Sequence, residues 1–221
     1  MSYYPVFLAL DGRPCLVIGG GEVAETKVEA LLHAGALVTV IAPAVTDRVG
    51  GLAQAGRVVH HSREYRSGDL SGFRLVIVAT DDPAINRRAA AEAEKEGALV
   101  NVVDAPELCT FIAPAVLERG DLQIAVSTSG AAPAFAARLR DRLASELGPE
   151  YAVALVILRK VRERLHAEAR PAAERRRILR DLAESDLAAL AKARDRERID
   201  RLLADCLGDG MSLERLGVAL P

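Results

Sequence analysis

A glycine-rich loop is the first part of this sequence with the residue types and spacing for chemistry. Gly19, Gly20 and Gly21 directly follow an apolar run, and with Ala24 they form the pattern G-x-G-x-x-A ahead of a helical periodicity. In such a strand, loop and helix, Gly19 permits a tight turn and Gly21 lets backbone N–H groups approach a pyrophosphate, while Ala24 allows close packing of helix on strand. The pattern predicts a dinucleotide-binding loop.

The acid that usually accompanies such a loop is missing. An Asp or Glu about twenty residues on, at the end of the second strand, normally binds the adenosine ribose, but here that strand ends Val40-Ile41-Ala42-Pro43. The sequence therefore does not distinguish NAD from NADP. Arg48 is the nearest cation downstream and could meet a 2′-phosphate, although a solvated helix position is the favoured alternative. The residues expected to bind the cofactor are Gly19, Gly20, Gly21, Glu22, Val23, Ala42, Pro43, Thr80, Asp81, Asn101 and Val102.

Histidines and cysteines show no spacing typical of a resident metal. His60 and His61 are adjacent on a predicted strand, so their side chains lie on opposite faces and cannot share one ion. Three widely spaced cysteines fit neither a disulfide framework nor a CxxC site, and we expect them to be reduced. We predict no bound metal.

The glycine loop must be held in place by the strands and helices around it. Apolar runs alternate with segments of helical periodicity along the first hundred residues. They predict a Rossmann-type doubly wound parallel sheet, an α/β fold. The expected strands are Cys15–Ile18, Val38–Ala42, Val58–His60, Leu75–Ala79 and Leu99–Val103. The expected helices are Glu22–Ala34, ended by Gly35, and Pro83–Glu96, with Asp81-Asp82 as its cap and Gly97 after it. Thr80-Asp81-Asp82 would then lie beside the cofactor as well as at the helix start.

The alternation of predicted strands and helices changes after residue 103, and we divide the chain into three parts. Residues 1–110 are the NAD-binding domain, residues 111–148 a small α/β central segment, and residues 149–221 a helical C-terminal domain. The central segment contains the stretch Phe111–Arg119, the apolar run Leu122–Val126 and a helix Pro133–Leu147. The helices expected after it are Glu150–Ala169, Ala172–Leu182 and Asp186–Leu207.

Composition excludes several classes of protein. The chain has 221 residues, 27% of them charged, and a formal net charge of -2, which argues against a nucleic-acid-binding protein. No apolar run approaches the length of a membrane span, and no signal peptide is recognisable, so we expect a cytoplasmic protein without membrane contact. Arginines far outnumber lysines among its 29 cations, which suits a polycarboxylate ligand, although a genome-wide bias is the favoured explanation.

Short motifs within residues 3–150 occur in the order of one known module. They are Asp11-Gly12-Arg13, the glycine loop with Lys27, Ala79-Thr80-Asp81-Asp82, Asn101-Val102-Val103-Asp104, Pro106–Phe111 and Ser127–Pro133. Together they closely resemble the precorrin-2 dehydrogenase and sirohydrochlorin ferrochelatase module of siroheme synthase. The helical remainder is similar to that family in length and character only.

The resemblance implies an oxidoreductase that converts precorrin-2 to sirohydrochlorin with NAD in siroheme biosynthesis, a branch of porphyrin biosynthesis. Some members also insert ferrous iron, a lyase activity that this sequence leaves open. The family forms homodimers through an intertwined central region. The apolar strands and helix of residues 111–147 are too small to form an independent core, so we expect them to pair with a second chain. The chain stops without the methyltransferase domain that some siroheme synthases append, which implies the shorter form. A narrower alternative keeps dehydrogenation alone, and one from another class is a non-catalytic NAD-binding sensor.

Asp104 is the expected catalytic residue. It closes the fifth strand at the carboxyl end, where doubly wound sheets place their active sites, and the resemblance puts the family's functional aspartate there. Its carboxylate could accept the proton lost during oxidation, or pyrrole N–H protons during metal insertion. The structural alternative is a turn-forming Asp before Ala105-Pro106. The precorrin-2 macrocycle carries eight carboxylate arms, and the residues expected to bind it are Ser127, Thr128, Ser129, Arg119 and Arg138.

Overall fold

The computed structural model describes residues 3–220 of the chain. Its packing divides the chain into two compact units, with the boundary between Ala113 and Pro114.

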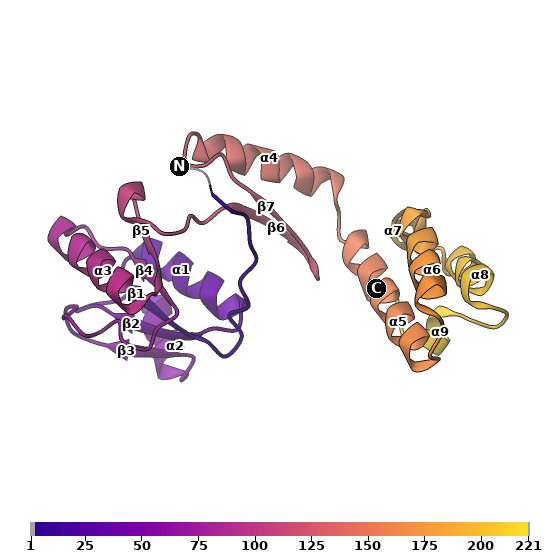
Figure 1. The fold of residues 1–221 in the computed structure, drawn as a ribbon, viewed down its shortest axis with the longest axis horizontal. Helices are drawn as coiled ribbons and strands as arrows, with labels where there is room; N and C mark the ends of the chain where they lie inside the picture. Colours follow the sequence, from indigo (N-terminus) through magenta and orange to yellow (C-terminus); the bar gives the residue numbers. More distant parts are fainter. Residues whose placement is uncertain (1–2, 221) are drawn as a thin grey trace. The chain divides into compact units, whose positions relative to one another are not determined.

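The first unit is built on a five-stranded parallel sheet (Figure 1). Its strands are β1 (Pro14–Ile18), β2 (Leu37–Ile41), β3 (Val58–His61), β4 (Leu75–Val78) and β5 (Leu99–Val102). The strand order is β3-β2-β1-β4-β5, so the chain moves outward in one direction from β1 and then returns to build the other half from β4. In such sheets, ligands bind at the carboxyl ends of the strands where the order reverses, which here is between β1 and β4.

Helices cover both faces of this sheet (Figure 1). Helices α1 (Glu22–His33) and α2 (Asp47–Gln54) pack on one face, and α3 (Pro83–Glu96) packs on the other. Successive residues of β1 serve the two layers in turn, since Val17 belongs to the core under α1 and Leu16 to the core under α3. Strands buried on both faces, such as β1 and β4, have continuous apolar sequences, which makes them easy to predict from sequence.

Local signals explain where the helices begin and end. The Asp82 side chain accepts from the N–H groups of Ala84 and Ile85 to cap α3, and Gly97 ends that helix at φ 67°. Thr46 caps α2 by accepting from the Val49 N–H. Side-chain oxygens at the first position satisfy amide groups that have no partner within the helix.

The predicted sheet and its two long helices are confirmed, with each expected boundary within a residue of the observed one. Helix α1 ends at His33 with Ala34 as its cap, one position earlier than expected, and Gly35 follows at φ 77°. Helix α2 was not among the expected elements.

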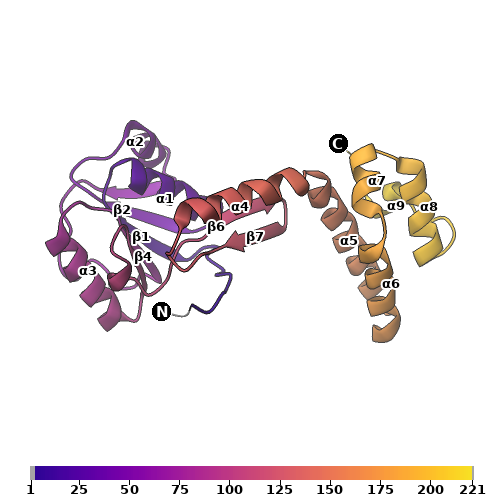
Figure 2. The ribbon, with the colours of Figure 1, turned by 90° about the horizontal axis from the view of Figure 1, so that it is seen from above.

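The second unit begins with a β-hairpin and a helix. Strands β6 (Ala115–Arg119) and β7 (Leu122–Val126) pair antiparallel, and α4 (Pro133–Glu146) packs along them (Figure 2). The Arg119 guanidinium donates to the carbonyl groups of Ala144 and Leu147 at the carboxyl end of α4 and to that of Glu118. Leu117 and Ala136 are the buried apolar residues of this segment.

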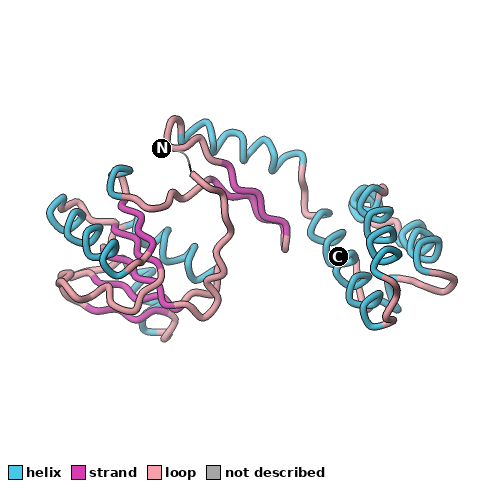
Figure 3. The backbone as a smooth tube through the Cα atoms, in the orientation of Figure 1, coloured by secondary structure: helices cyan, strands magenta, loops and turns pink. Residues whose placement is uncertain are grey.

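The rest of the second unit is helical (Figure 3). Its helices are α5 (Glu150–Ala167), α6 (Ala172–Glu184), α7 (Leu187–Ala193), α8 (Arg196–Leu207) and α9 (Leu213–Leu216). One apolar core joins all five helices, with Ile157, Ile178 and Ile199 fully buried in it. Within residues 3–220, no helix is long and apolar enough to cross a membrane.

The single helix expected over residues 186–207 is wrong. Arg194 adopts the left-handed φ of 57° and divides it into α7 and α8, and Asp195 caps α8 by accepting from the Arg198 N–H. The break lets Leu190 and Leu203 both reach the same core, so packing overrides a continuous helical propensity.

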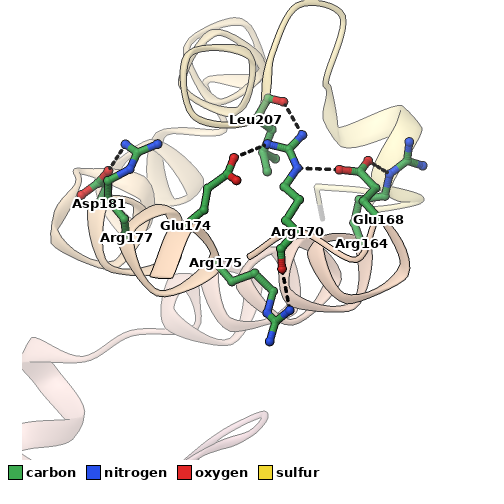
Figure 4. Close-up of polar contacts among 8 residues, drawn as sticks. All are labelled: Arg164, Glu168, Arg170, Glu174, Arg175, Arg177, Asp181 and Leu207. Carbon is green, nitrogen blue, oxygen red and sulfur yellow. Dashed lines mark hydrogen bonds and ion pairs between the residues drawn. The ribbon is translucent and has the colours of Figure 1, made fainter. Parts of the chain in front are cut away.

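The Arg170 side chain forms hydrogen bonds with residues of three of these helices (Figure 4). Its guanidinium donates to Glu168 at the end of α5, to Glu174 in α6 and to the Leu207 carbonyl at the end of α8, over 2.8, 3.1 and 3.1 Å. Hydrogen bonds from Arg164 and Arg170 hold the pKa of Glu168 below its usual range. Several charged side chains of the helical part are therefore engaged with one another.

Candidate functional site

A cleft of about 980 Å³ lies at the carboxyl ends of the parallel strands. Its walls come from the loop between β1 and α1, the first turn of α1, the segment after β2, the loop after β3, the β4–α3 connection and the turn after β5. All the residues that line it belong to the first unit. The cleft therefore occupies the place that the strand order predicts for a ligand.

The glycine loop is shaped by close backbone approaches. Gly19 has φ 122°, and a Cβ there would lie 2.1 Å from the Ala79 carbonyl oxygen. A Cβ on Gly20 would lie 1.9 Å from the carbonyl oxygen of Ala44. Neither position accepts a side chain, because backbone of the neighbouring segments occupies the space.

Gly21 differs from the other two glycines of the loop. It is the N-cap of α1 in an extended conformation, and apart from its own chain neighbours no atom of residues 3–220 lies within 4 Å of where its Cβ would be. Among the described residues no side chain caps this helix, and Gly21, Glu22 and Val23 all line the cleft. The first-turn N–H groups of a helix have no partner within it, and with the helix dipole they attract phosphate.

The β4–α3 connection supplies polar groups on the other side of the switch point. The Thr80 hydroxyl donates to the side-chain oxygen of Asn86 over 2.8 Å, and Asn86 donates back to the Thr80 carbonyl. Asp82 is occupied as the α3 cap, whereas the Asp81 side chain is exposed. Thr80 and Asp81 thus lie where the sequence placed them, at the edge of the cleft.

Asp104 lies in the cleft on a left-handed turn. Its φ is 58°, its side chain is exposed, and within residues 3–220 its carboxylate has no hydrogen-bond or ion-pair partner. The Cys109 thiol contacts the backbone on both sides of Asp104. It accepts from the Val102 N–H at 3.2 Å and lies 3.3 Å from the Ala105 carbonyl oxygen. Burial raises the pKa of Cys109, which keeps the thiol protonated as a donor.

Two of the expected cofactor residues do not line the cleft. Asn101 is turned to the loop that follows β5, where its amide donates to the Phe111 carbonyl over 3.0 Å. Val102 is 2% exposed and packs in the core under α3. The remaining expected contacts, Gly19, Gly20, Gly21, Glu22, Val23, Ala42, Pro43, Thr80 and Asp81, all line it.

The residues expected to bind substrate lie in the second unit. Ser127 and Thr128 use their hydroxyl oxygens to accept from the N–H groups of Ser129 and Ala132 in the turn before α4. Arg119 is engaged with three carbonyl groups, as described above. Arg138 is exposed on α4. Their role toward a substrate stays a prediction.

Sequence reasoning missed the contribution of the loop after β3. Glu64 and Tyr65 both line the cleft, and no sequence motif indicates either residue. Because β3 is parallel to its neighbours, its carboxyl end reaches the same edge of the sheet, and that rule alone could have drawn attention to residues 62–65.

The geometry of the cleft fits a dinucleotide. The loop has no room for a Cβ at Gly19 or Gly20 but is open at Gly21, which begins α1. Backbone N–H groups at such an open helix N-terminus can bind phosphate. No group of three or more His, Cys, Asp or Glu side chains within residues 3–220 is arranged to hold a metal ion. The fold and this cleft define a dinucleotide-binding protein of the Rossmann class.

Comparisons with known proteins agree with this class. A family model described as putative NAD(P)-binding matches residues 6–115, and one described as the central part of sirohaem biosynthesis proteins matches residues 119–146. The siroheme synthase of Methylococcus capsulatus is 40% identical over 202 residues, which cover 90% of this chain and 43% of that protein. The siroheme synthase of Pseudoalteromonas atlantica is 37% identical over 207 residues, covering 94% and 45%.

A solved structure gives the same result. SirC, a precorrin-2 dehydrogenase, matches with a TM-score of 0.78 and 28% identity over 90% of this chain and 98% of that one. The chain belongs to the sirohaem biosynthesis family that carries these NAD(P)-binding and central segments. It spans less than half the length of the curated relatives it matches.

Proposed function

We propose that the chain oxidises precorrin-2 to sirohydrochlorin with NAD as the oxidant. The observation that carries the proposal is the unpaired carboxylate of Asp104 in the same cleft as the glycine loop. A proton acceptor beside a dinucleotide site is the minimum that such a dehydrogenation needs. The names of the relatives, siroheme synthase and precorrin-2 dehydrogenase, support the choice of substrate.

The residues of the chain divide the work between binding and proton transfer. The N–H groups at the start of α1 and the glycine loop hold the pyrophosphate. The bound nicotinamide supplies the hydride acceptor. Asp104 takes up the proton that the macrocycle loses, so that one precorrin-2 and one NAD give sirohydrochlorin, NADH and a proton. Ser127, Thr128, Ser129, Arg119 and Arg138 bind the carboxylate arms of the macrocycle in this proposal.

Iron insertion is a second candidate, favoured by the same carboxylate. A group that accepts one proton from the macrocycle can also collect the two pyrrole protons that a metal displaces. Ferrous iron would then enter as a substrate and leave in the product. The chain would act in the cytoplasm as a homodimer, as expected from its sequence.

Incubation of the purified chain with precorrin-2 and NAD tests the proposal. We expect the visible spectrum to change to that of sirohydrochlorin, with NADH formed in equal amount. Addition of ferrous or cobaltous ion should then change the spectrum again if the chain is also a chelatase. Binding of NAD without any oxidation of precorrin-2 would instead favour the non-catalytic sensor.

A further inference from the structure

The charged side chains on the walls of the cleft are all of one sign, negative. Within residues 3–220, the charged residues that line the cleft are all acidic, namely Glu22, Glu64, Asp81, Asp82 and Asp104. In the described part of the chain, none of the lining residues is Lys, Arg or His. A 2′-phosphate brought into this cleft would therefore meet carboxylates without a compensating cation.

Two arginines close in sequence to residues of the cleft, Arg48 and Arg63, pair with carboxylates that do not line the cleft. Arg48, the nearest cation after β2, is exposed on α2 and pairs with Glu29 over 2.8 Å, and it does not line the cleft. Arg63 directly precedes Glu64, but its guanidinium donates to both carboxylate oxygens of Asp69 over 2.7 and 2.8 Å. The solvated helix position favoured for Arg48 is the one observed.

The loop after β3 is anchored on both sides of Glu64. Arg63 is held by Asp69, and Tyr65 is 5% exposed, with its hydroxyl donating to Glu92 over 2.6 Å. Glu92 also accepts from the N–H groups of Gly68 and Leu70. These contacts fix the backbone that carries Glu64.

The same loop is tied to the end of β2. The Ser62 hydroxyl donates to the Pro43 carbonyl over 3.0 Å, and Nε2 of His60 lies 3.0 Å from the Ala42 carbonyl oxygen. The end of β2 is where the fold normally places the acid that binds the adenosine ribose. Glu64 thus lines the cleft from a loop joined to that position, and within residues 3–220 its carboxylate has no hydrogen-bond or ion-pair partner.

We propose that Glu64 binds the ribose hydroxyls of the adenosine half of NAD and excludes NADP, in place of the acid missing from the end of β2. A carboxylate accepts from both hydroxyls of a ribose, and it repels the 2′-phosphate that distinguishes NADP. The inference rests on the dinucleotide site of the proposed function but not on the choice of substrate.

Direct binding measurements on the full chain test the inference. Calorimetry with NAD, NADP and 2′-deoxy-NAD would compare the parent with Glu64→Gln and Glu64→Ala. Glu96→Gln is the matched control, since Glu96 is exposed at the end of α3 and does not line the cleft. The unfolding midpoints of the variants should agree with that of the parent.

We expect the parent to bind NAD at least tenfold more tightly than NADP. Glu64→Ala should weaken NAD binding about tenfold, the size of one charge-assisted hydrogen bond, and should abolish the difference between NAD and its 2′-deoxy analogue. Glu64→Gln should improve NADP relative to NAD by about tenfold, because the like charge is gone. Glu96→Gln should change none of these values.

The outcomes separate this inference from the proposed function. Unchanged affinities for both cofactors in both Glu64 variants would overturn the inference while leaving the dehydrogenase intact. The expected shifts in a protein that does not oxidise precorrin-2 would uphold the role of Glu64 and overturn the proposed substrate.

Discussion

Gly19 and Gly21 are separated by one residue, yet their substitution should have different consequences. A Cβ at Gly19 meets the Ala79 carbonyl oxygen at 2.1 Å on a backbone of φ 122°, whereas a Cβ at Gly21 meets nothing within 4 Å. We expect Gly19→Ala to lower the free energy of unfolding by several kcal/mol, since both backbone strain and overlap must be relieved. Chemical denaturation would measure it.

Gly21→Asp should keep the fold and lose the cofactor. The added carboxylate would occupy the opening in front of the α1 N-terminus, where we expect the pyrophosphate to bind. We expect NAD affinity to fall by several kcal/mol, measured by calorimetry, with Gly21→Ala giving a smaller loss. A well-folded Gly21→Asp protein with parental NAD affinity would contradict the assignment of the loop.

Asp104→Asn is the substitution that isolates proton transfer. Asn keeps the size of the side chain and adopts the left-handed φ of 58° more readily than Ala. The dehydrogenase rate should fall at least about 100-fold with NAD affinity unchanged, because an amide cannot take up the proton. If the same group collects pyrrole protons, metal insertion into supplied sirohydrochlorin should fall too, and Gly21→Asp should spare it. An Asp104→Asn enzyme with the parental rate would reduce this residue to a turn former.

At the scale of elements, the loop after β3 depends on Asp69. Hydrogen bonds from Arg63, together with one from the Arg66 N–H, hold the pKa of Asp69 below its usual range. Asp69→Asn should lower the free energy of unfolding by about 1–3 kcal/mol near neutral pH. A lowered pKa contributes stability above the unfolded value of about 3.9, and this contribution is lost as the pH falls through the folded value. Denaturation at several pH values should therefore show the two proteins converging below about pH 4, and a constant difference would contradict the argument.

The strands and two long helices of the sheet could be predicted because their signals are local. Continuous apolar runs mark strands buried on both faces, and the caps at Asp82 and Gly97 mark α3. Helix α2 escaped prediction because Gly50 and Gly51 interrupt its pattern. The break at Arg194 has no Gly or Pro to announce it and follows from packing in the helical core.

The site was predictable to the extent that it depends on the glycine loop and strand ends. Thr80, Asp81 and Asp104 follow apolar runs directly, so their place at the carboxyl edge could be inferred from the strand pattern. Glu64 and Tyr65 could not be placed in the same way. Their loop is positioned by Glu92, which lies on a helix far along the chain, and no periodicity in the sequence records that contact.

At the scale of the whole molecule, the central segment is the part whose own core is smallest. It buries Leu117 and Ala136, while Val116 is 41% and Phe135 53% exposed. We expect light scattering at micromolar concentration to give twice the mass of one chain, because a second copy would bury such apolar side chains. Val116→Glu combined with Phe135→Glu should shift the protein toward monomer.

Leu37→Glu is the control for assembly. Leu37 is 62% exposed and apolar like the other two residues, but it begins β2 in the first unit. The same change of charge there should leave the dimer intact. A fully active parental monomer would contradict the prediction that two chains are needed.

The walls of the cleft, which carry no cation within residues 3–220, also determine how dinucleotide binding responds to ionic strength. Where lysines and arginines hold an anionic ligand, added salt screens the attraction and weakens binding. In the proposed site the phosphates would face backbone N–H groups at the start of α1, and the charged groups on the walls are carboxylates. Added salt weakens the repulsion between those carboxylates and the phosphates more than it weakens the short hydrogen bonds to the phosphates. Dinucleotide affinity in this cleft should thus hold, or rise slightly, between dilute buffer and physiological salt.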